Sequence, residues 1–263
     1  MTPDTIILVF TVLLGTIVGS FLNVVILRLP REGDSLVFPA SHCPVCMAEL
    51  HWYENIPVLS YLFLRGKCGH CKAKISMQYP LVELAMAALS GCLFLKFGLT
   101  SAFGGYFLFT SALLVVIMID LYHYIIPDSI DLPGAVLGIL FSFINPVVSW
   151  QSSLLGVVCG GGILWLVAWI YALLRNKEGM GGGDIKLLAM IGAWLGWECL
   201  PFVIFFSAFT GAIIGITTLY ILKKDHSTQI PFGPFLSGAA LIYMFFSEHI
   251  DYFLQLYLSG QWP

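Results

Sequence analysis

The chain is organised around Gly179-Met180-Gly181-Gly182-Gly183-Asp184, which runs directly into Ile185-Lys186-Leu187-Leu188-Ala189-Met190-Ile191-Gly192. Glycine permits positive φ and lets another backbone come close, because it has no side chain. A carboxylate at the edge of an apolar layer is costly, and it therefore marks a functional-site hypothesis. We predict that Gly181, Gly182 and Gly183 present Asp184 at a membrane boundary.

The composition predicts a membrane protein. Of the 263 residues, 59% are hydrophobic and only 10% are charged, whereas soluble domains carry about 25% charged residues. Because about 20 apolar residues span a bilayer, we expect an all-α polytopic protein of about eight spanning helices, surrounded by membrane lipid and without a nucleic-acid partner. The expected spans lie near residues 6–27, 79–95, 103–119, 130–148, 154–174, 184–197, 202–222 and 231–246.

Three regions follow from this pattern. Residues 1–29 form the first transmembrane helix, residues 30–78 a small polar insertion, and residues 79–263 a multi-helix membrane domain. Within the first span, the small and polar residues from Gly19 to Asn23 are typical of helix contacts. The apolar run at residues 185–222 is too long for one helix, and we expect a break at Glu198-Cys199-Leu200-Pro201, which leaves a short helix after Asp184.

The insertion contains two C-x-x-C pairs, Cys43-Pro44-Val45-Cys46 and Cys68-Gly69-His70-Cys71. Four thiolates at these spacings can close a tetrahedron around zinc. Disulfides or free thiols are the alternatives. Four cysteines leave no open position for an activated water, so we expect zinc to stabilise the insertion rather than to cleave peptides.

Basic residues predict the orientation. An alternation of eight spans places every Lys and Arg except Lys96 on one side of the membrane. The positive-inside rule makes that side the cytosol. The insertion, the glycine-rich loop and the end of the third span would then all face the cytosol.

A second carboxylate, Asp120, ends the third span between Ile119 and Leu121. It should lie at the same depth and on the same side as Asp184. Two carboxylates in a partly desolvated site do not easily both ionise, so they can share one proton, and one can act on water while the other donates to a carbonyl. This is the chemistry of aspartic peptidases.

Other interpretations of the carboxylates remain open. Each aspartate could cap a helix or pair with Lys186 or His123, and Asp128 could cap the fourth helix. A proton-coupled transporter also places acids near membrane spans. A third possibility is a zinc-ribbon assembly factor of a secretion apparatus, which would not need the aspartates.

Several motifs together resemble those of the type IV prepilin peptidases, and they follow one another in that family's order over nearly the full chain. They are Gly19-Ser20-Phe21-Leu22-Asn23 through Leu29-Pro30, the two cysteine pairs, Ile119-Asp120 through Pro127-Asp128, Gly179 to Asp184, and Pro231-Phe232-Gly233-Pro234. Members of the family are GxGD aspartic peptidases of the bacterial inner membrane.

The resemblance implies an activity and its residues. Asp120 and Asp184 would be the catalytic pair, and Gly181, Gly182 and Gly183 would complete the GxGD loop. The enzyme would remove the short basic leader of prepilins or pseudopilins, for a type IV pilus or a type II secretion system. Members with the cysteine-bearing insertion also methylate the new N-terminus with S-adenosylmethionine.

The methyl-donor pocket has no clear signature in the sequence. No soluble βαβ unit with a glycine-rich nucleotide turn is present, so a pocket must involve the cytosolic insertion or helix ends. Glu83 and Glu178 could contact a new N-terminal amine or a basic leader. The alternative for each is a boundary carboxylate in water or paired with a lysine.

Overall fold

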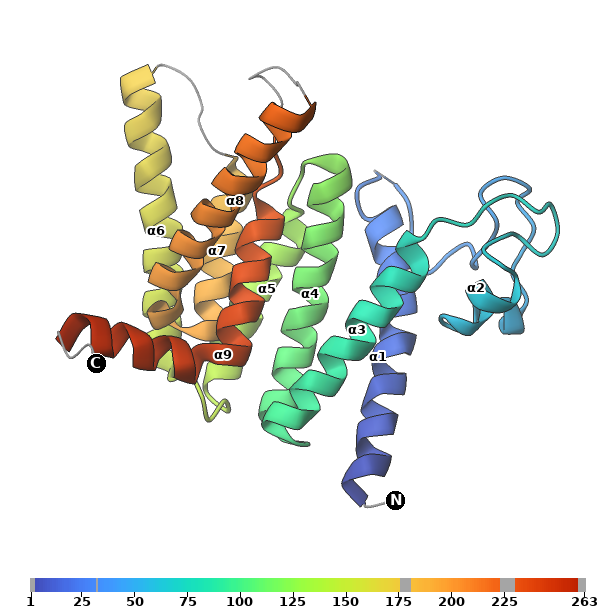
Figure 1. Ribbon diagram of the computed structural model, residues 1–263, viewed down its shortest axis with the longest axis horizontal. Helices are drawn as coiled ribbons and strands as arrows, with labels where there is room; N and C mark the ends of the chain where they lie inside the picture. The colour runs from blue at the N-terminus through green and yellow to red at the C-terminus, as the bar shows by residue number, and fades with distance from the viewer. Residues whose placement is uncertain (1–2, 32, 176–180, 223–229, 260–263) are drawn as a thin grey trace. The chain divides into compact units, whose positions relative to one another are not determined.

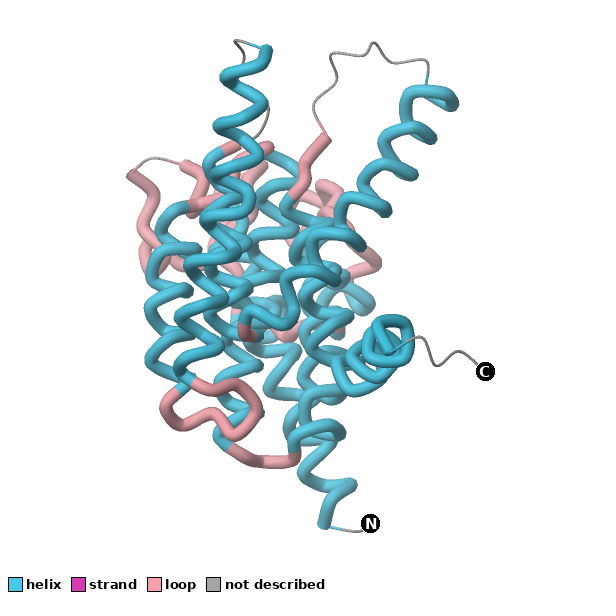
Figure 2. The backbone as a smooth tube through the Cα atoms, turned by 90° about the vertical axis from the view of Figure 1, so that its left-hand side faces the viewer, coloured by secondary structure: helices cyan, strands magenta, loops and turns pink. Residues whose placement is uncertain are grey.

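The computed structural model describes residues 3–31, 33–175, 181–222 and 230–259, and the described part contains helices and no strand (Figures 1 and 2). The long helices are α1 (Pro3–Arg28), α3 (Gln78–Phe97), α4 (Ser101–His123), α5 (Asp128–Ser142), α6 (Trp150–Arg175), α7 (Gly182–Leu195), α8 (Leu200–Leu222) and α9 (Gly233–Ser259). The short ones are η1 (Trp52–Asn55), α2 (Leu59–Phe63) and η2 (Trp197–Cys199).

Within the described residues, five helices are long and apolar enough to cross a membrane, namely α1, α3, α4, α6 and α8. The prediction of an all-helical, multi-pass membrane protein is therefore confirmed. Each predicted span overlaps a helix, but the one expected at 130–148 ends at Ser142, α5 and α7 contain only 15 and 14 residues, and α9 bends at Phe246. The total of eight crossings stays a prediction.

The long apolar run breaks close to the predicted place. Helix α7 ends at Leu195, Gly196 adopts a φ of 83°, η2 follows, and α8 begins at Leu200. A positive φ suits glycine because it has no Cβ, so the break starts two residues before Glu198. At 1.5 Å per residue, α7 is about 21 Å long, which is shorter than the bilayer core.

The chain forms two compact units, Met1–Val115 and Val116–Pro263. In the first, α1 crosses α3 with their backbones close together: a Cβ on Gly15 would lie 2.7 Å from the Met86 carbonyl oxygen, and one on Gly19 would lie 2.7 Å from the Glu83 Cα. Asn23 Nδ2 donates to the Tyr79 carbonyl at 3.1 Å. The predicted helix contacts of the Gly19–Asn23 segment are thus confirmed.

The second unit is built around α7, which packs against α5, α6 and α9 (Figure 1). Helices α6 and α7 touch backbone to backbone where Gly156 meets Gly192, since a Cβ on either glycine would overlap the other. Ser153 Oγ donates to the Ala193 carbonyl at 2.7 Å, and Trp194 Nε1 donates to the Gly134 carbonyl at 2.8 Å. These contacts fix the packing of α7 against α5 and α6, and the glycine-rich loop precedes its N-terminal end.

Candidate active site

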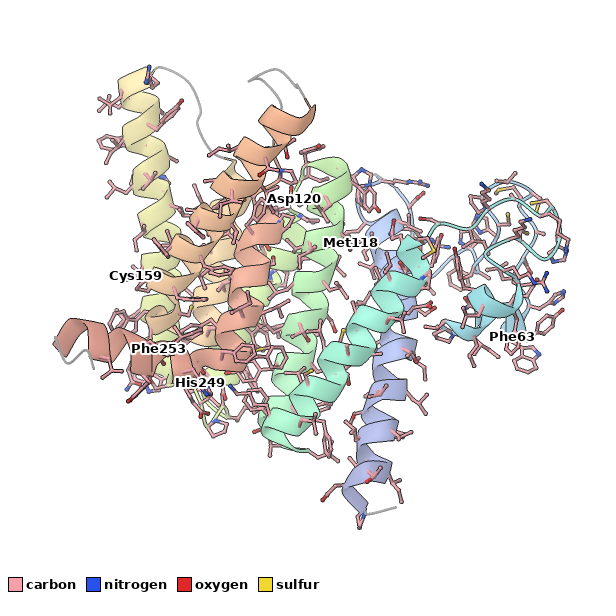
Figure 3. The ribbon with its side chains drawn as sticks, viewed as in Figure 1. Phe63, Met118, Asp120, Cys159, His249 and Phe253 are labelled. Atoms are coloured by element: carbon pink, nitrogen blue, oxygen red, sulfur yellow. The ribbon has the colours of Figure 1, made fainter. Side chains whose placement is uncertain are left out.

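Asp120 lies in the last turn of α4 and is 4% exposed (Figure 3). Its Oδ2 accepts a hydrogen bond from the Gly233 backbone N–H at 2.8 Å. Gly233 is the first residue of α9, and the first N–H groups of a helix have no partner within the helix and favour a negative charge. The N-terminus of α9 therefore fixes the position of the Asp120 carboxylate.

Glycine allows the Asp120 carboxylate to approach the backbone closely at this contact. A Cβ on Gly233 would lie 2.7 Å from Asp120 Oδ2 and 3.1 Å from Ile126 Cδ1. The sequence motif Pro231 to Pro234 carried no assigned role, and its packing against Asp120 was missed. Its signal was present in the sequence, since a glycine followed by a proline is typical of a helix start.

Asp184 is the third residue of α7, and its side chain is half-buried. Its backbone N–H donates to the Gly181 carbonyl at 3.2 Å. Within the second unit, Asp184 and Asp120 lie close enough for their negative charges to repel each other. The two carboxylates that the sequence singled out, 64 positions apart, are therefore brought together by the packing of α4, α7 and α9.

The glycines before Asp184 serve close approach rather than positive φ. Gly181 has a φ of −69°, and neither Gly182 nor Gly183 has a positive φ, so of the two properties of glycine only close approach is used here. A Cβ on Gly183 would lie 2.9 Å from Ile126 Cβ, whereas one on Gly182 would meet no atom of the described residues within 4 Å. Gly183 is thus required by packing, whereas no described residue packs against Gly182. Gly179 and Met180 lie outside the described residues.

Lys186 pairs with Asp128 and with neither member of the carboxylate pair. Its Nζ donates to both Asp128 carboxylate oxygens at 2.7 Å, which links α7 to the start of α5. Asp128 makes no side-chain cap of α5, whose N-cap is Pro127, so the capping alternative is wrong for this residue. Among the described residues, neither Asp120 nor Asp184 forms an ion pair with a lysine.

Asp131 is a buried carboxylate that the sequence interpretation missed. It is 0% exposed, and neither of its oxygens has a hydrogen-bond partner among the described groups. It lies one turn after Asp128 on α5, within electrostatic reach of Lys186 and Asp184. The spacing of three residues places Asp128 and Asp131 on one helix face. This spacing was the feature of the sequence from which Asp131 could have been identified.

The four cysteines of the insertion, Cys43, Cys46, Cys68 and Cys71, bring their sulfur atoms within 4.8 Å of one another and form no disulfide. The Cys43 and Cys71 sulfurs are 3.9 Å apart, close to the separation of about 3.8 Å expected for two thiolates on one tetrahedral zinc with Zn–S bonds near 2.3 Å. The geometry fits zinc and argues against the disulfide alternative.

The backbone of each knuckle supports thiolates. Met47 and Lys72, at matching places after the second cysteine of each pair, have φ values of 58° and 61°. Hydrogen bonds from the backbone N–H groups of Cys46 and Val45 lower the pKa of the Cys43 thiol to about 7. The N–H groups of Cys71 and His70 likewise lower the pKa of Cys68. A lower thiol pKa favours metal binding, because the ligand is the thiolate.

The first unit also contains a cavity of about 680 Å³ beside the insertion. Glu83, in its wall, is 6% exposed, and its Oε2 accepts a hydrogen bond from the Val58 backbone N–H at 2.7 Å. Small-molecule sites commonly occupy 300–1,000 Å³, so this cavity could hold a cofactor. Glu83 therefore has a protein partner, while Glu178 lies outside the described residues.

Comparison with known proteins gives two family matches. Residues 13–97 match the bacterial peptidase A24 N-terminal domain, and residues 107–216 match the type IV leader peptidase family. No solved structure matches the chain.

Among curated proteins, the chain is 43% identical to the prepilin leader peptidase/N-methyltransferase of Pseudomonas aeruginosa, over 91% of this chain and 90% of the relative. It is 38% identical to the protein of that name from Burkholderia pseudomallei, over 91% and 85%. The protein of that name from Aeromonas hydrophila is 39% identical, over 90% of each chain.

Proposed function

The chain belongs to the type IV leader peptidase family, and we propose that Asp120 and Asp184 are the catalytic pair with which it cleaves prepilin leaders. The protein is a prepilin peptidase that also N-methylates its product. The observation that supports the assignment of the pair is that the two carboxylates lie within electrostatic reach of each other, one held by the N-terminus of α9 and the other at the start of α7. The comparisons lend no support to a transporter.

The pair acts through one shared proton. The ionised carboxylate takes a proton from a water molecule, and the oxygen of that water attacks the scissile carbonyl carbon. The protonated carboxylic acid donates its proton to the carbonyl oxygen. The tetrahedral intermediate then breaks its C–N bond as the carboxylate that took the proton from water gives it to the leaving amine. A hydroxyl of the intermediate returns a proton to the other carboxylate, which restores the pair with one shared proton. The Gly233 N–H holds one oxygen of Asp120 throughout, so the carboxylate needs little reorganisation.

The substrate suits a site at the membrane boundary. A prepilin or pseudopilin has a polar leader followed by an apolar helix, so its scissile bond lies where the membrane meets the cytosol. Open space beside Gly182 would let an extended substrate backbone approach Asp184. We place this site and the cysteine insertion on the cytosolic face of a bacterial inner membrane, because the basic residues of the sequence gather on that side.

Zinc and S-adenosylmethionine are the proposed cofactors. Zinc in the set Cys43, Cys46, Cys68 and Cys71 stabilises the insertion, as their sulfur geometry supports. S-adenosylmethionine supplies the methyl group for the new N-terminus, in keeping with the N-methyltransferase name of the relatives.

The test uses purified protein, a prepilin-like substrate and S-adenosylmethionine, with mass spectrometry of the products. Wild type should release the leader and add one methyl group, and methylation should stop when S-adenosylmethionine is omitted. Asp184→Asn should cleave at least about 10³-fold more slowly, yet methylate a substrate supplied already cleaved. Cleavage by Asp184→Asn at the wild-type rate would remove Asp184 from the mechanism.

A further inference from the structure

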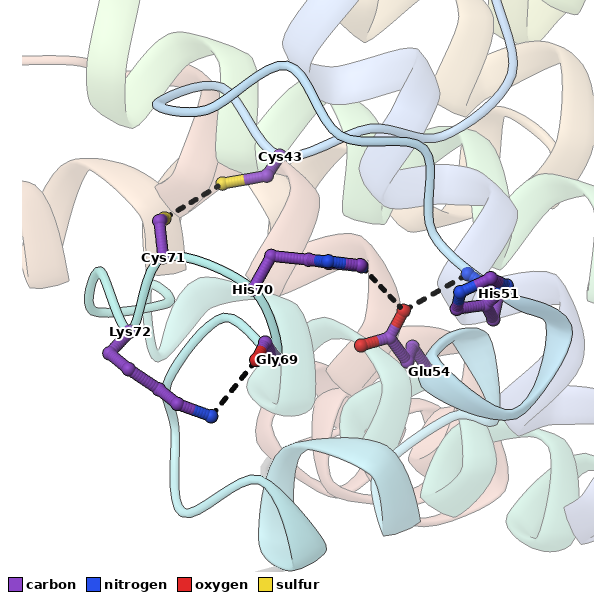
Figure 4. A network of polar contacts seen from close by, with 7 residues as sticks. All are labelled: Cys43, His51, Glu54, Gly69, His70, Cys71 and Lys72. Atoms are coloured by element: carbon purple, nitrogen blue, oxygen red, sulfur yellow. Dashed lines mark hydrogen bonds and ion pairs between the residues drawn. The ribbon is translucent and has the colours of Figure 1, made fainter.

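We propose that His51, Glu54 and His70 form a second divalent-metal site in the insertion, separate from the four cysteines. Their side chains offer two imidazole nitrogens and a carboxylate oxygen, and these donor atoms all lie within 4.8 Å of one another. Figure 4 shows the three side chains converging, with Glu54 between the two histidines. The set would take a borderline divalent cation such as Zn²⁺ or Co²⁺, for which imidazole and carboxylate are suitable ligands.

The Glu54 carboxylate is fixed at the centre of the cluster. Its side chain is only 5% exposed, and a buried carboxylate is costly unless a positive group or several hydrogen bonds compensate it. Its Oε2 accepts a hydrogen bond from the His51 backbone N–H at 3.0 Å. Gly69 makes room for the other oxygen, because a Cβ there would overlap Glu54 Oε1. Glu54 is therefore held under the second cysteine knuckle before any ion binds.

The two histidines lie at separations that a shared ion would explain. His70 Nε2 is 3.7 Å from Glu54 Oε2, which is too long for a hydrogen bond. Two ligand atoms on one tetrahedral ion with bonds near 2.0–2.1 Å lie about 3.4 Å apart, so a small movement would suffice. The His51 ring stacks on Tyr53 with centroids 5.3 Å apart, and its centroid is 5.9 Å from that of His70.

This site differs from the cysteine site in its access to solvent and to further ligands. Three protein ligands leave a position for water or another ligand, whereas four thiolates close the coordination sphere. The side chain of His70 is 43% exposed, so an ion here would exchange with solvent. His70 lies between Cys68 and Cys71, and an ion on the thiolates would order the knuckle that carries it. The cysteine site should therefore fill first.

The test counts metal ions in tag-free, full-length protein equilibrated with a micromolar free-zinc buffer, by elemental mass spectrometry. Wild type should bind one more zinc per chain than either Glu54→Gln or His51→Asn, while both variants keep the zinc of the cysteines. His42→Asn is the matched control, because His42 belongs to the same insertion but contacts the Ala40 carbonyl instead; it should bind as much zinc as wild type.

Cobalt distinguishes the two sites. The first equivalent of Co²⁺ should produce thiolate-to-metal absorption in the near ultraviolet, and the second should add only weak visible bands that Glu54→Gln abolishes. The proposal is overturned if wild type binds zinc on its cysteines alone, or if the additional ion persists in Glu54→Gln. It is also overturned if His51→Asn loses both ions, because the cluster would then only support the fold of the insertion.

Discussion

The cysteine insertion and the aspartate site differ in how far apart along the chain their residues lie. Cys43 and Cys71 are 28 positions apart, whereas Asp120 and the Gly233 N–H that holds it are 113 positions apart. Local turns and one metal can close the first site. The second exists only when α4, α7 and α9 pack. Removal of the metal should therefore disrupt the cysteine site, and a change in helix packing should disrupt the aspartate site.

The largest expected effect of packing is at Gly233. In Gly233→Ala the new methyl group would lie 2.7 Å from Asp120 Oδ2, so the carboxylate must move. A displacement near 1 Å at a reacting group can cost about 10²-fold in rate, and we expect a loss of that order in the kcat of leader cleavage. Gly238→Ala is the control on the same helix, because a Cβ there meets nothing within 4 Å. Equal rates for the two variants would contradict the role of Gly233.

A smaller effect should separate Gly183 from Gly182. Gly183→Ala would press against Ile126, and overpacking of this kind costs about 1–3 kcal/mol, so the Tm of the detergent-solubilised protein should fall. Gly182→Ala should leave Tm unchanged and raise KM, because the methyl group enters the open space proposed for substrate. Thermal unfolding and steady-state cleavage provide both values. A stable Gly183→Ala with wild-type kinetics would refute the packing argument.

The smallest effect on the chemistry is expected from the cysteines. Cys43→Ser should lose the zinc of the insertion and lower stability, since metal binding is coupled to folding. In protein that remains folded, kcat for cleavage should fall by less than about tenfold, because zinc takes no part in the proton transfers proposed here. Cys92→Ser, in α3 and outside the cluster, is the control.

Zinc content and cleavage should be measured on the same samples. If folded Cys43→Ser lost its kcat for leader cleavage while KM stayed unchanged, the cysteine insertion would contribute to the chemistry at the aspartate site. Wild-type stability and cleavage in the metal-free variant would instead show that zinc has no structural role.

The sequence predicted what local patterns determine. The apolar runs predicted the eight long helices, because each run is continuous in the sequence. The two C-x-x-C pairs predicted the sulfur cluster, because each pair lies within four residues and both pairs belong to one short insertion. Asp120 and Asp184 were found because a carboxylate beside an apolar run is conspicuous. The break after α7 was predicted to begin at Glu198, but it begins two residues earlier, because Gly196 and not Pro201 ends the helix.

Long-range contacts were not predictable in this way. The Gly233 N–H that holds Asp120, the packing of Ile126 against Gly183, and the buried Asp131 all depend on which helix faces lie together. The glycine-rich loop shows the same limit. The glycines did not reveal which neighbour they admit: none of Gly181 to Gly183 has a positive φ, and Gly183 is needed for the close approach of α7 to Ile126.

The most direct test of the account is a double-mutant cycle on the carboxylate pair. Leader cleavage is measured by mass spectrometry for wild type, Asp120→Asn, Asp184→Asn and the double variant, all confirmed as folded by Tm and zinc content. Residues that act as one unit are not additive, so each single variant should lose about 10³-fold and the double variant should be no slower than the slower single variant. Losses that multiply, or wild-type cleavage by either single variant, would contradict a shared catalytic pair.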